Sequence, residues 1–231
     1  MGLNLSILGD SVLMGITLGE NNRYVVNKQS DEEITAATGM KVRNLSRMGQ
    51  TTDRALLRGA AEKLAPQEGL HLVLIEYGGN DCDFDWKEIS DDPARLHDCR
   101  VPMERFLENY KKLIDAVQNV GAIPVASTLM PIDAARYFNW FCKDGVVPKK
   151  VLEWLKEVSA IYRWQEMYSV AIEKLARSER IPVLDLRTPF LAEHDIGACL
   201  SADGIHPSVF GQRLLCRTIR TQLPAIAAAA S

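Results

Sequence analysis

The run of residues 70–77, Leu-His-Leu-Val-Leu-Ile-Glu-Tyr, limits the fold more than any other part of the sequence. A short and nearly continuous apolar run that ends at glycines, here Gly78 and Gly79, is typical of a buried β-strand. Strands that are apolar on both faces occur in parallel sheets, where helices cover the two sides. This run therefore predicts an α/β protein that is built around a parallel sheet.

Four further segments share this strand character, and helical patterns separate them along the chain. The five expected strands are residues 3–8, 41–45, 70–77, 122–129 and 181–186. Strands that alternate with helices predict a three-layer α/β/α fold with a five-stranded, mostly parallel sheet. A chain of 231 residues without a linker or a repeat is expected to form one domain, residues 1–231.

Three of the connecting segments carry definite expectations. Residues 12–18 fit either a short helix or a loop. A long helical pattern begins at Pro148 and continues to about Arg177. The closing helix is expected to begin at Pro207, because proline is favourable at the first helical position, and to end near Leu223.

The charge and the cysteine content narrow the range of functions. A formal net charge of −3 gives no electrostatic case for binding nucleic acid, and no apolar run reaches the roughly 18 residues of a membrane span. The five cysteines are scattered, as expected of free thiols in a reducing compartment. No export signal precedes the first strand, so a cytoplasmic location is expected, although a removed leader would leave the same sequence.

Polar residues follow the predicted strands at the points where each strand ends. Ser11 follows the first strand, Gly49 the second and Asn80 the third, while Asp203 and His206 follow the fifth. In a parallel sheet these loops open at one edge, which is where α/β proteins place their ligands. The set predicts a site for acyl transfer to a serine.

The chemistry of acyl transfer assigns each of these residues a role. A serine hydroxyl needs an adjacent base, so Ser11 is the expected nucleophile and His206 the base. Asp203 lies three residues before His206, where a tight turn directs its carboxylate at the second ring nitrogen. The backbone N–H groups of Ser11 and Gly49 and the side-chain amide of Asn80 are the expected donors to the oxyanion.

Other roles for the histidines and aspartates of the chain are less favourable. His194 is the main alternative base, but only Glu193 precedes it at close spacing. A metal site at Asp203 and His206 lacks a third ligand nearby, so no metal and no cofactor are expected. Asp10 and the aspartate at position 81 are expected to organise turns through hydrogen bonds to the backbone.

Four short motifs occur in a fixed order, each just after a predicted strand. They are Gly9-Asp10-Ser11, Gly49, Gly78-Gly79-Asn80-Asp81 and Asp203-Gly204-Ile205-His206. In these motifs, which cover residues 9–206, the chain resembles the SGNH hydrolases, also called GDSL esterases or lipases. Val12 stands where that family has leucine, a conservative change. The resemblance implies a flavodoxin-like SGNH hydrolase fold, the same triad and the same three oxyanion donors.

Two segments at this sheet edge, residues 82–102 and 130–148, are longer than the fold needs. Loops at such an edge carry specificity, so their aromatic residues are expected to line or cover a substrate pocket. The candidates are Trp86, Tyr137, Phe138 and Trp140. Covering a helix or forming a dimer contact is the alternative role, so a homo-oligomer stays open.

The favoured hypothesis is a serine ester hydrolase that cleaves carboxylic esters through an acyl-serine intermediate. Its expected partner is a small-molecule ester, most simply a soluble ester with a short acyl or acetyl group. An acyltransferase or a carbohydrate O-acetylesterase would use the same residues. An inactive binding domain is the alternative from a different class, since a fold alone does not fix function.

Overall fold

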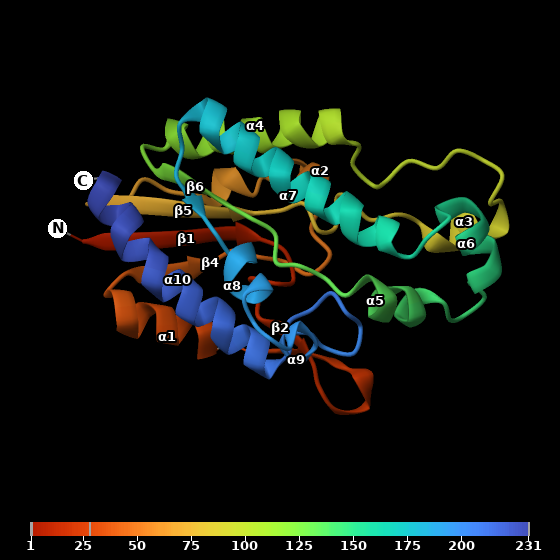
Figure 1. The fold of residues 1–231 in the computed structure, drawn as a ribbon. Helices are drawn as coiled ribbons and strands as arrows, with labels where there is room; N and C mark the ends of the chain where they lie inside the picture. Colours follow the sequence, from red (N-terminus) through yellow and green to blue (C-terminus); the bar gives the residue numbers. More distant parts are fainter. Residues whose placement is uncertain (1, 28, 231) are drawn as a thin grey trace.

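A parallel sheet of five strands forms the centre of the structure, a computed structural model that describes residues 2–27 and 29–230 (Figure 1). The strands lie in the order β4-β1-β5-β6-β7, which is the doubly wound order 2-1-3-4-5. Their bounds are β1 (Leu3–Gly9), β4 (Lys41–Asn44), β5 (Leu70–Glu76), β6 (Ile123–Ser127) and β7 (Val183–Leu184). The expected α/β fold is confirmed, and each predicted strand segment overlaps one of these strands.

Helices cover both faces of the sheet and give it three layers (Figure 1). One face packs against α2 (Thr52–Leu57), the 3₁₀ turn η2 (Ala61–Lys63), α4 (Met103–Asn119) and α7 (Ser159–Glu179). The other packs against α1 (Gln29–Thr38), α8 (Arg187–Leu191), α9 (Ile196–Cys199) and α10 (Val209–Ala230). The sheet is therefore buried on both sides, as the apolar character of β5 predicts.

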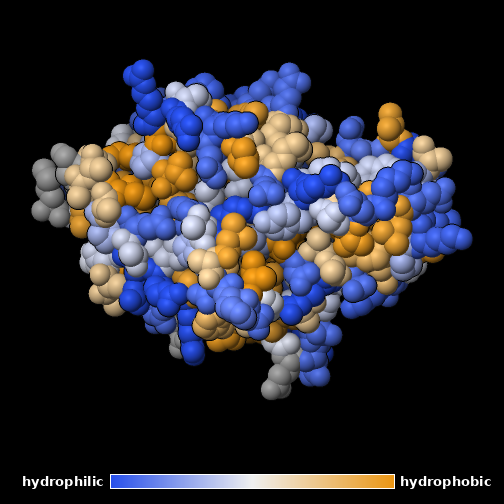
Figure 2. All heavy atoms as spheres, in the orientation of Figure 1, coloured by the Kyte–Doolittle hydropathy of each residue, from blue (hydrophilic) through white to orange (hydrophobic). Residues whose placement is uncertain are grey.

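Successive residues of a strand point to opposite faces, so each central strand supplies both cores. In β1, Leu5 and Ile7 pack on the α10 side, while Leu8 packs on the side of α4 and α7. Burying one such side chain stabilises the fold by about 1.5–3 kcal/mol. On the outside, Figure 2 shows hydrophobic residues in separate patches among hydrophilic ones.

A third group of helices lies beyond the carboxyl ends of the strands (Figure 1). It consists of α3 (Trp86–Asp91), α5 (Ala134–Phe141) and α6 (Pro148–Leu155). With the first turn of α7 they enclose a smaller apolar cluster that is rich in aromatic residues. The two long segments of the sequence analysis fold into α3 and α5, which stand over the edge of the sheet where a site is expected.

The prediction of a short helix or loop over residues 12–18 was wrong for residues 16–18, which form a strand. β2 (Ile16–Leu18) pairs antiparallel with β3 (Tyr24–Val26), and the hairpin is closed by a 2.8 Å bond from Gly19 N–H to the Arg23 carbonyl. All three residues of β3 are exposed, so the strand lacks the alternation of apolar and polar residues that indicates a half-buried strand.

The predicted helix over residues 148–177 is two helices, α6 and α7. The chain turns between them at Lys156, whose φ of +68° lies outside the helical range. The closing helix begins at Val209 rather than Pro207, because Pro207 pairs with Leu200 in an isolated β-bridge. The helix also continues beyond Leu223 to Ala230.

Candidate active site

Ser11 lies in the turn that follows β1, at the carboxyl edge of the sheet. The turn is held by hydrogen bonds from Met14 N–H to the Asp10 carbonyl and from Ile16 N–H to the Ser11 carbonyl, both 3.0 Å long. Because β1 lies between β4 and β5, the loops that follow both neighbours border this turn. Ser11 is 6% exposed and lines a cavity.

Three side chains from distant parts of the sequence form a continuous hydrogen-bonded chain. Ser11 Oγ lies 2.9 Å from His206 Nε2, and His206 Nδ1 lies 2.7 Å from Asp203 Oδ2. Asp203 is fully buried and His206 is 5% exposed. The structure thus brings together the three residues that the sequence analysis selected, in an arrangement that can activate a hydroxyl group.

The loop that carries Asp203 and His206 is fixed from within. Asp203 Oδ1 accepts hydrogen bonds from the backbone N–H groups of Ile205 and His206, at 3.2 and 3.1 Å. Gly204 has a φ of +75°, and a Cβ atom there would lie 2.6 Å from the Asp133 carbonyl oxygen. Only glycine fits at this position, so its side-chain-free backbone allows the loop to pack closely against the segment before α5.

The carboxyl group of Asp203 remains ionised despite its burial. Burial acts to raise its pKa, but the hydrogen bond and electrostatic interaction with His206 and the two backbone N–H bonds outweigh it, so the pKa is lowered. A carboxylate in this position holds the imidazole ring in one orientation and stabilises the imidazolium ion.

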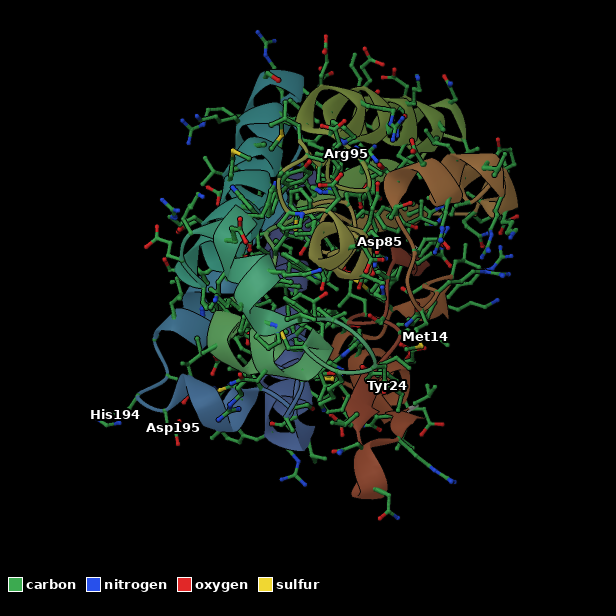
Figure 3. All side chains as sticks on the ribbon, turned by 90° about the vertical axis from the view of Figure 1, so that its right-hand side faces the viewer. Met14, Tyr24, Asp85, Arg95, His194 and Asp195 are labelled. Atoms are coloured by element: carbon green, nitrogen blue, oxygen red, sulfur yellow. The ribbon has the colours of Figure 1, made fainter. Side chains whose placement is uncertain are left out.

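Tyr24, which the sequence analysis did not select, contacts His206 from β3. The two rings are 4.9 Å apart at 57°, and Tyr24 also lines the cavity. Burial and the Asp203 carboxylate raise the pKa of Tyr24 to about 12, so its hydroxyl stays neutral. In Figure 3, Tyr24 lies on the N-terminal part of the chain, well away from His194. His194 is exposed, in the segment between α8 and α9.

The loop with Gly49 lies beside Ser11 because the chain follows β1 beyond the end of β4. Hydrogen bonds from Leu45 N–H to the Ile7 carbonyl and from Arg47 N–H to the Gly9 carbonyl continue the pairing, at 2.8 and 3.1 Å. Gly49 has a φ of +65°, a conformation that favours glycine, and it lines the same cavity as Ser11.

Asn80 reaches the cavity from the loop after β5, and an aspartate fixes its side chain. Asn80 Nδ2 donates to Asp10 Oδ2 at 2.7 Å, and Asp10 Oδ1 accepts from Val12 N–H at 2.9 Å. Asp10 therefore organises its turn, as expected, and also contacts an expected oxyanion donor. The contact joins residues 70 positions apart, which no local pattern indicates.

Asp81 connects the Asn80 loop to the start of α2. Its Oδ1 atom accepts a 2.8 Å hydrogen bond from the backbone N–H of Thr52, and its Oδ2 atom is buried without a hydrogen-bond partner in the described structure. Burial raises the pKa of Asp81 to about 7. The expected turn residue is thus a buried contact between the two loops that carry Gly49 and Asn80.

A cavity of about 690 Å³ extends from Ser11 and His206 toward α3, α5 and α7. Its walls are mainly aromatic and aliphatic, and Trp86, Tyr137 and Trp140 are among the lining residues. Phe138 instead is buried in the cluster behind the cavity, where its ring packs edge-on against Phe141. Three of the four expected pocket residues therefore line the cavity.

Asp83 holds the aromatic wall together, a role that its sequence context did not indicate. Its Oδ1 atom accepts hydrogen bonds from Trp86 Nε1 at 3.0 Å and from the Tyr137 hydroxyl at 2.9 Å. Its Oδ2 atom forms a 3.0 Å ion pair with Arg100. The Trp86 ring stacks on Phe141 with centroids 4.3 Å apart. These contacts fix the shape of the cavity before any ligand enters.

Residues 2–27 and 29–230 hold neither a metal-binding cluster nor a membrane-spanning helix. No group of three or more His, Cys, Asp or Glu side chains is placed to hold a metal ion there. No helix of this part is both long enough and apolar enough to cross a membrane.

The sequence profile of the GDSL-like lipase/acylhydrolase family matches residues 7–214 of the chain. The matched region contains all the residues placed around Ser11 above. No curated protein matches the chain significantly.

Solved structures share the fold over nearly the whole chain. A lipase/acylhydrolase from Enterococcus faecalis is 19% identical with a TM-score of 0.63, and the match covers 96% of each chain. A variant acetyl xylan esterase from Geobacillus stearothermophilus is 17% identical with a TM-score of 0.65, covering 96% of this chain and 94% of that one. A GDSL-like lipase from Bacteroides thetaiotaomicron is 15% identical with a TM-score of 0.60, covering 96% and 88%. At such identities the likeness concerns the fold.

Proposed function

The chain belongs to the GDSL-like lipase/acylhydrolase family, as its four motifs indicated, and from this premise we propose that it is a carboxylic ester hydrolase. One observation carries the proposal: the hydrogen-bonded chain from Asp203 through His206 to Ser11, with distances of 2.7 and 2.9 Å. Ser11 is the proposed nucleophile, His206 the base, and Asp203 the group that orients the base. No cofactor is needed for this chemistry.

In the acylation step, His206 Nε2 removes the proton from Ser11 Oγ while the oxygen attacks the ester carbonyl carbon. The carbonyl oxygen becomes an oxyanion, which the N–H groups of Ser11 and Gly49 and the Asn80 amide stabilise. Each such donor contributes about 10²–10³ in rate. The imidazolium form of His206, stabilised by Asp203, then gives its proton to the departing alcohol.

In the deacylation step, a water molecule replaces the alcohol. His206 removes a proton from this water, which attacks the acyl-serine carbonyl. The second tetrahedral intermediate uses the same oxyanion donors, and its collapse returns the proton to Ser11 and releases the acid. If an alcohol entered in place of water, the same steps would give acyl transfer.

The cavity supports a substrate with one large apolar group. A volume of about 690 Å³ is within the range of pockets that bind drug-sized ligands, and it greatly exceeds the size of an acetyl group. Trp86, Tyr137 and Trp140 offer flat apolar surfaces to such a group. If the acyl group on Ser11 is short, as expected from the sequence, the bulky group in the cavity is the alcohol part of the ester.

A carbohydrate O-acetylesterase is the second candidate. Its support is the aromatic wall, since apolar ring faces can pack against sugars, together with the shared fold of an acetyl xylan esterase. Release of acetate from acetylated xylo-oligosaccharides, compared with acetates of aromatic alcohols, separates the two candidates.

The experiment that tests the proposal combines labelling with turnover. A fluorophosphonate is expected to label Ser11, and the protein is expected to hydrolyse p-nitrophenyl acetate, whereas Ser11→Ala does neither. The proposal is wrong if fluorophosphonate does not label the protein and no ester is hydrolysed in a series of short acyl groups and varied alcohols. The chain would then be a binding domain.

A further inference from the structure

Two buried carboxyl groups lie next to each other beneath the proposed site. Glu76, the last residue of β5, is the register partner of Gly9, so Asp10 follows directly beside it. Both residues are only 2% exposed, and the backbone nitrogen of Asp10 lies 3.4 Å from Glu76 Oε2. Within the described residues, neither carboxyl group forms an ion pair with a lysine or arginine. The mechanism above uses neither group.

Two adjacent buried carboxyl groups do not both ionise, since each charge disfavours the other. Burial raises the pKa of both groups, and the charge of Asp10 raises that of Glu76 further. The Val12 N–H, the electrostatic interaction with His206 and the hydrogen bond from Glu76 act in the opposite direction on the pKa of Asp10. Glu76 therefore holds the proton, and Asp10 carries the negative charge.

The charge on Asp10 decides which way the Asn80 amide faces. A carboxylate only accepts hydrogen bonds, so the group 2.7 Å from Asp10 Oδ2 must be the NH₂ and not the carbonyl of Asn80. One N–H is used in this bond, and the second remains for the cavity that Asn80 lines. A neutral Asp10 could donate to the amide carbonyl, and the amide could then turn over.

We propose that Asp10 is a positioning residue: its carboxylate accepts one N–H of the Asn80 amide at 2.7 Å and so holds the second N–H directed at the substrate oxyanion. This inference rests on the proposed ester hydrolysis for its effect on rate. A turned amide would direct its carbonyl oxygen at the oxyanion, so two negative groups would face each other instead of a donor and an acceptor.

A double-mutant cycle of Asp10→Asn and Asn80→Ala tests whether Asp10 acts through Asn80. Asn80→Ala is expected to lower kcat by about 10²–10³, and Asp10→Asn by a smaller factor of about 10–10², with KM changed less than about threefold. The double variant is expected to match Asn80→Ala within about twofold. A multiplied loss in the double variant overturns the proposal, because it shows that Asp10 acts independently of Asn80.

Glu76 variants keep the proposal testable if Asp10→Asn does not fold. Glu76→Gln retains an N–H that can donate to Asp10, whereas Glu76→Leu removes the donor and keeps a similar volume. Glu76→Leu is expected to lower kcat at least about tenfold more than Glu76→Gln. In the Asn80→Ala background this difference between the two variants is expected to disappear. Equal losses in the two variants contradict the proposal. Asp98→Asn, the loss of an exposed carboxylate, is the matched control.

A measurement without substrate separates this inference from the proposed function. The Asn80 side-chain amide is identified in the NMR spectrum by its disappearance in Asn80→Ala. One of its protons is expected to lie downfield of the other through the bond to Asp10, and to shift upfield in Asp10→Asn. An unchanged amide signal overturns the positioning role, whereas a shifted amide in a protein without ester hydrolysis overturns only the proposed function.

Discussion

The ring of Tyr24 lies 4.9 Å from the ring of His206, although the two residues belong to opposite ends of the sequence. Through this contact the β2–β3 hairpin covers one side of the proposed base. The contact shields the ring from water and limits its rotation, so the hairpin contributes to the site without supplying a reacting group.

Tyr24→Ala is expected to lower kcat/KM by up to about tenfold, because an aromatic contact of this kind contributes about 0.5–1.5 kcal/mol. Tyr24→Phe keeps the ring and is expected to retain most of the activity, since the hydroxyl stays neutral. Steady-state kinetics of both variants with one ester check this prediction. Equal losses in the two variants would show that the hydroxyl, and not the ring, matters.

His206→Gln is expected to lower kcat by about 10⁴ or more, because the serine then lacks a base. His194→Gln, the same substitution at the exposed alternative histidine, is expected to leave kcat unchanged. Ester hydrolysis by the two variants is compared at equal protein concentration, determined from absorbance and not from active-site labelling. A large loss in His194→Gln would reverse the choice between the two histidines.

Trp140→Ala is expected to change selectivity more than stability, because Trp140 is half-buried at the cavity wall. The ratio of kcat/KM for a bulky over a small alcohol ester should fall severalfold, as apolar contact area is lost. Trp154→Ala removes a half-buried tryptophan of the cluster behind the cavity and serves as control. An unchanged ratio in Trp140→Ala would remove this residue from the pocket.

Asp81 predicts an unusual dependence of stability on pH. Its pKa is raised to about 7 in the folded state, so between about pH 4 and pH 7 the folded chain holds a proton that the unfolded chain has lost. The free energy of unfolding therefore falls as pH rises through this window, by up to about 1.4 kcal/mol per pH unit for this one group. Above pH 7 the loss is complete.

Asp81→Asn is expected to remove this contribution while keeping an acceptor for Thr52 N–H. Urea unfolding at several pH values between 4 and 8 should show the variant gaining stability relative to the wild type as pH rises. Asp98→Asn, at an exposed position, is the control. A difference between Asp81→Asn and the wild type that does not vary with pH contradicts the prediction.

Gly204→Ala is expected to lower both stability and activity, because the added Cβ would meet the Asp133 carbonyl at 2.6 Å. Gly39→Ala is a matched control: its φ of +67° is similar, but nothing lies within 4 Å of the added Cβ. The control should cost only the backbone strain, about 1–2 kcal/mol, and keep its kcat. If thermal unfolding and kcat respond alike in the two variants, the close approach at Gly204 has no separate effect.

The strand pattern and the motif order were readable in the sequence because both depend on local composition. The apolar run of β5 reflects burial on two faces, and the glycines after it reflect turn geometry. Both features can be recognised from a few consecutive residues. The positions of Ser11 and His206 follow from the rule that parallel strands end at one edge. For these features, short-range pattern and general topology are sufficient.

The supporting contacts could not be read in this way. The bond from Asn80 to Asp10, the bonds from Trp86 and Tyr137 to Asp83, and the fit of Gly204 all join segments that meet only in the folded chain. A buried aspartate and a turn aspartate look the same in sequence, since both follow a strand and precede a polar loop. The exposed β3 strand was missed for a related reason. A strand with no buried residue lacks the alternation of apolar and polar residues by which strands are predicted.

The pairing of Ser11 with His206 across 195 positions has a consequence for how the protein is made. Ribosomes release the strand with the nucleophile first, and the base only after all the other strands have emerged. Domains fold as units during synthesis, and a nascent or truncated chain without residues 203–206 lacks the proposed base. The proposed ester hydrolysis therefore becomes possible only once residues 203–206 have emerged and packed against Ser11.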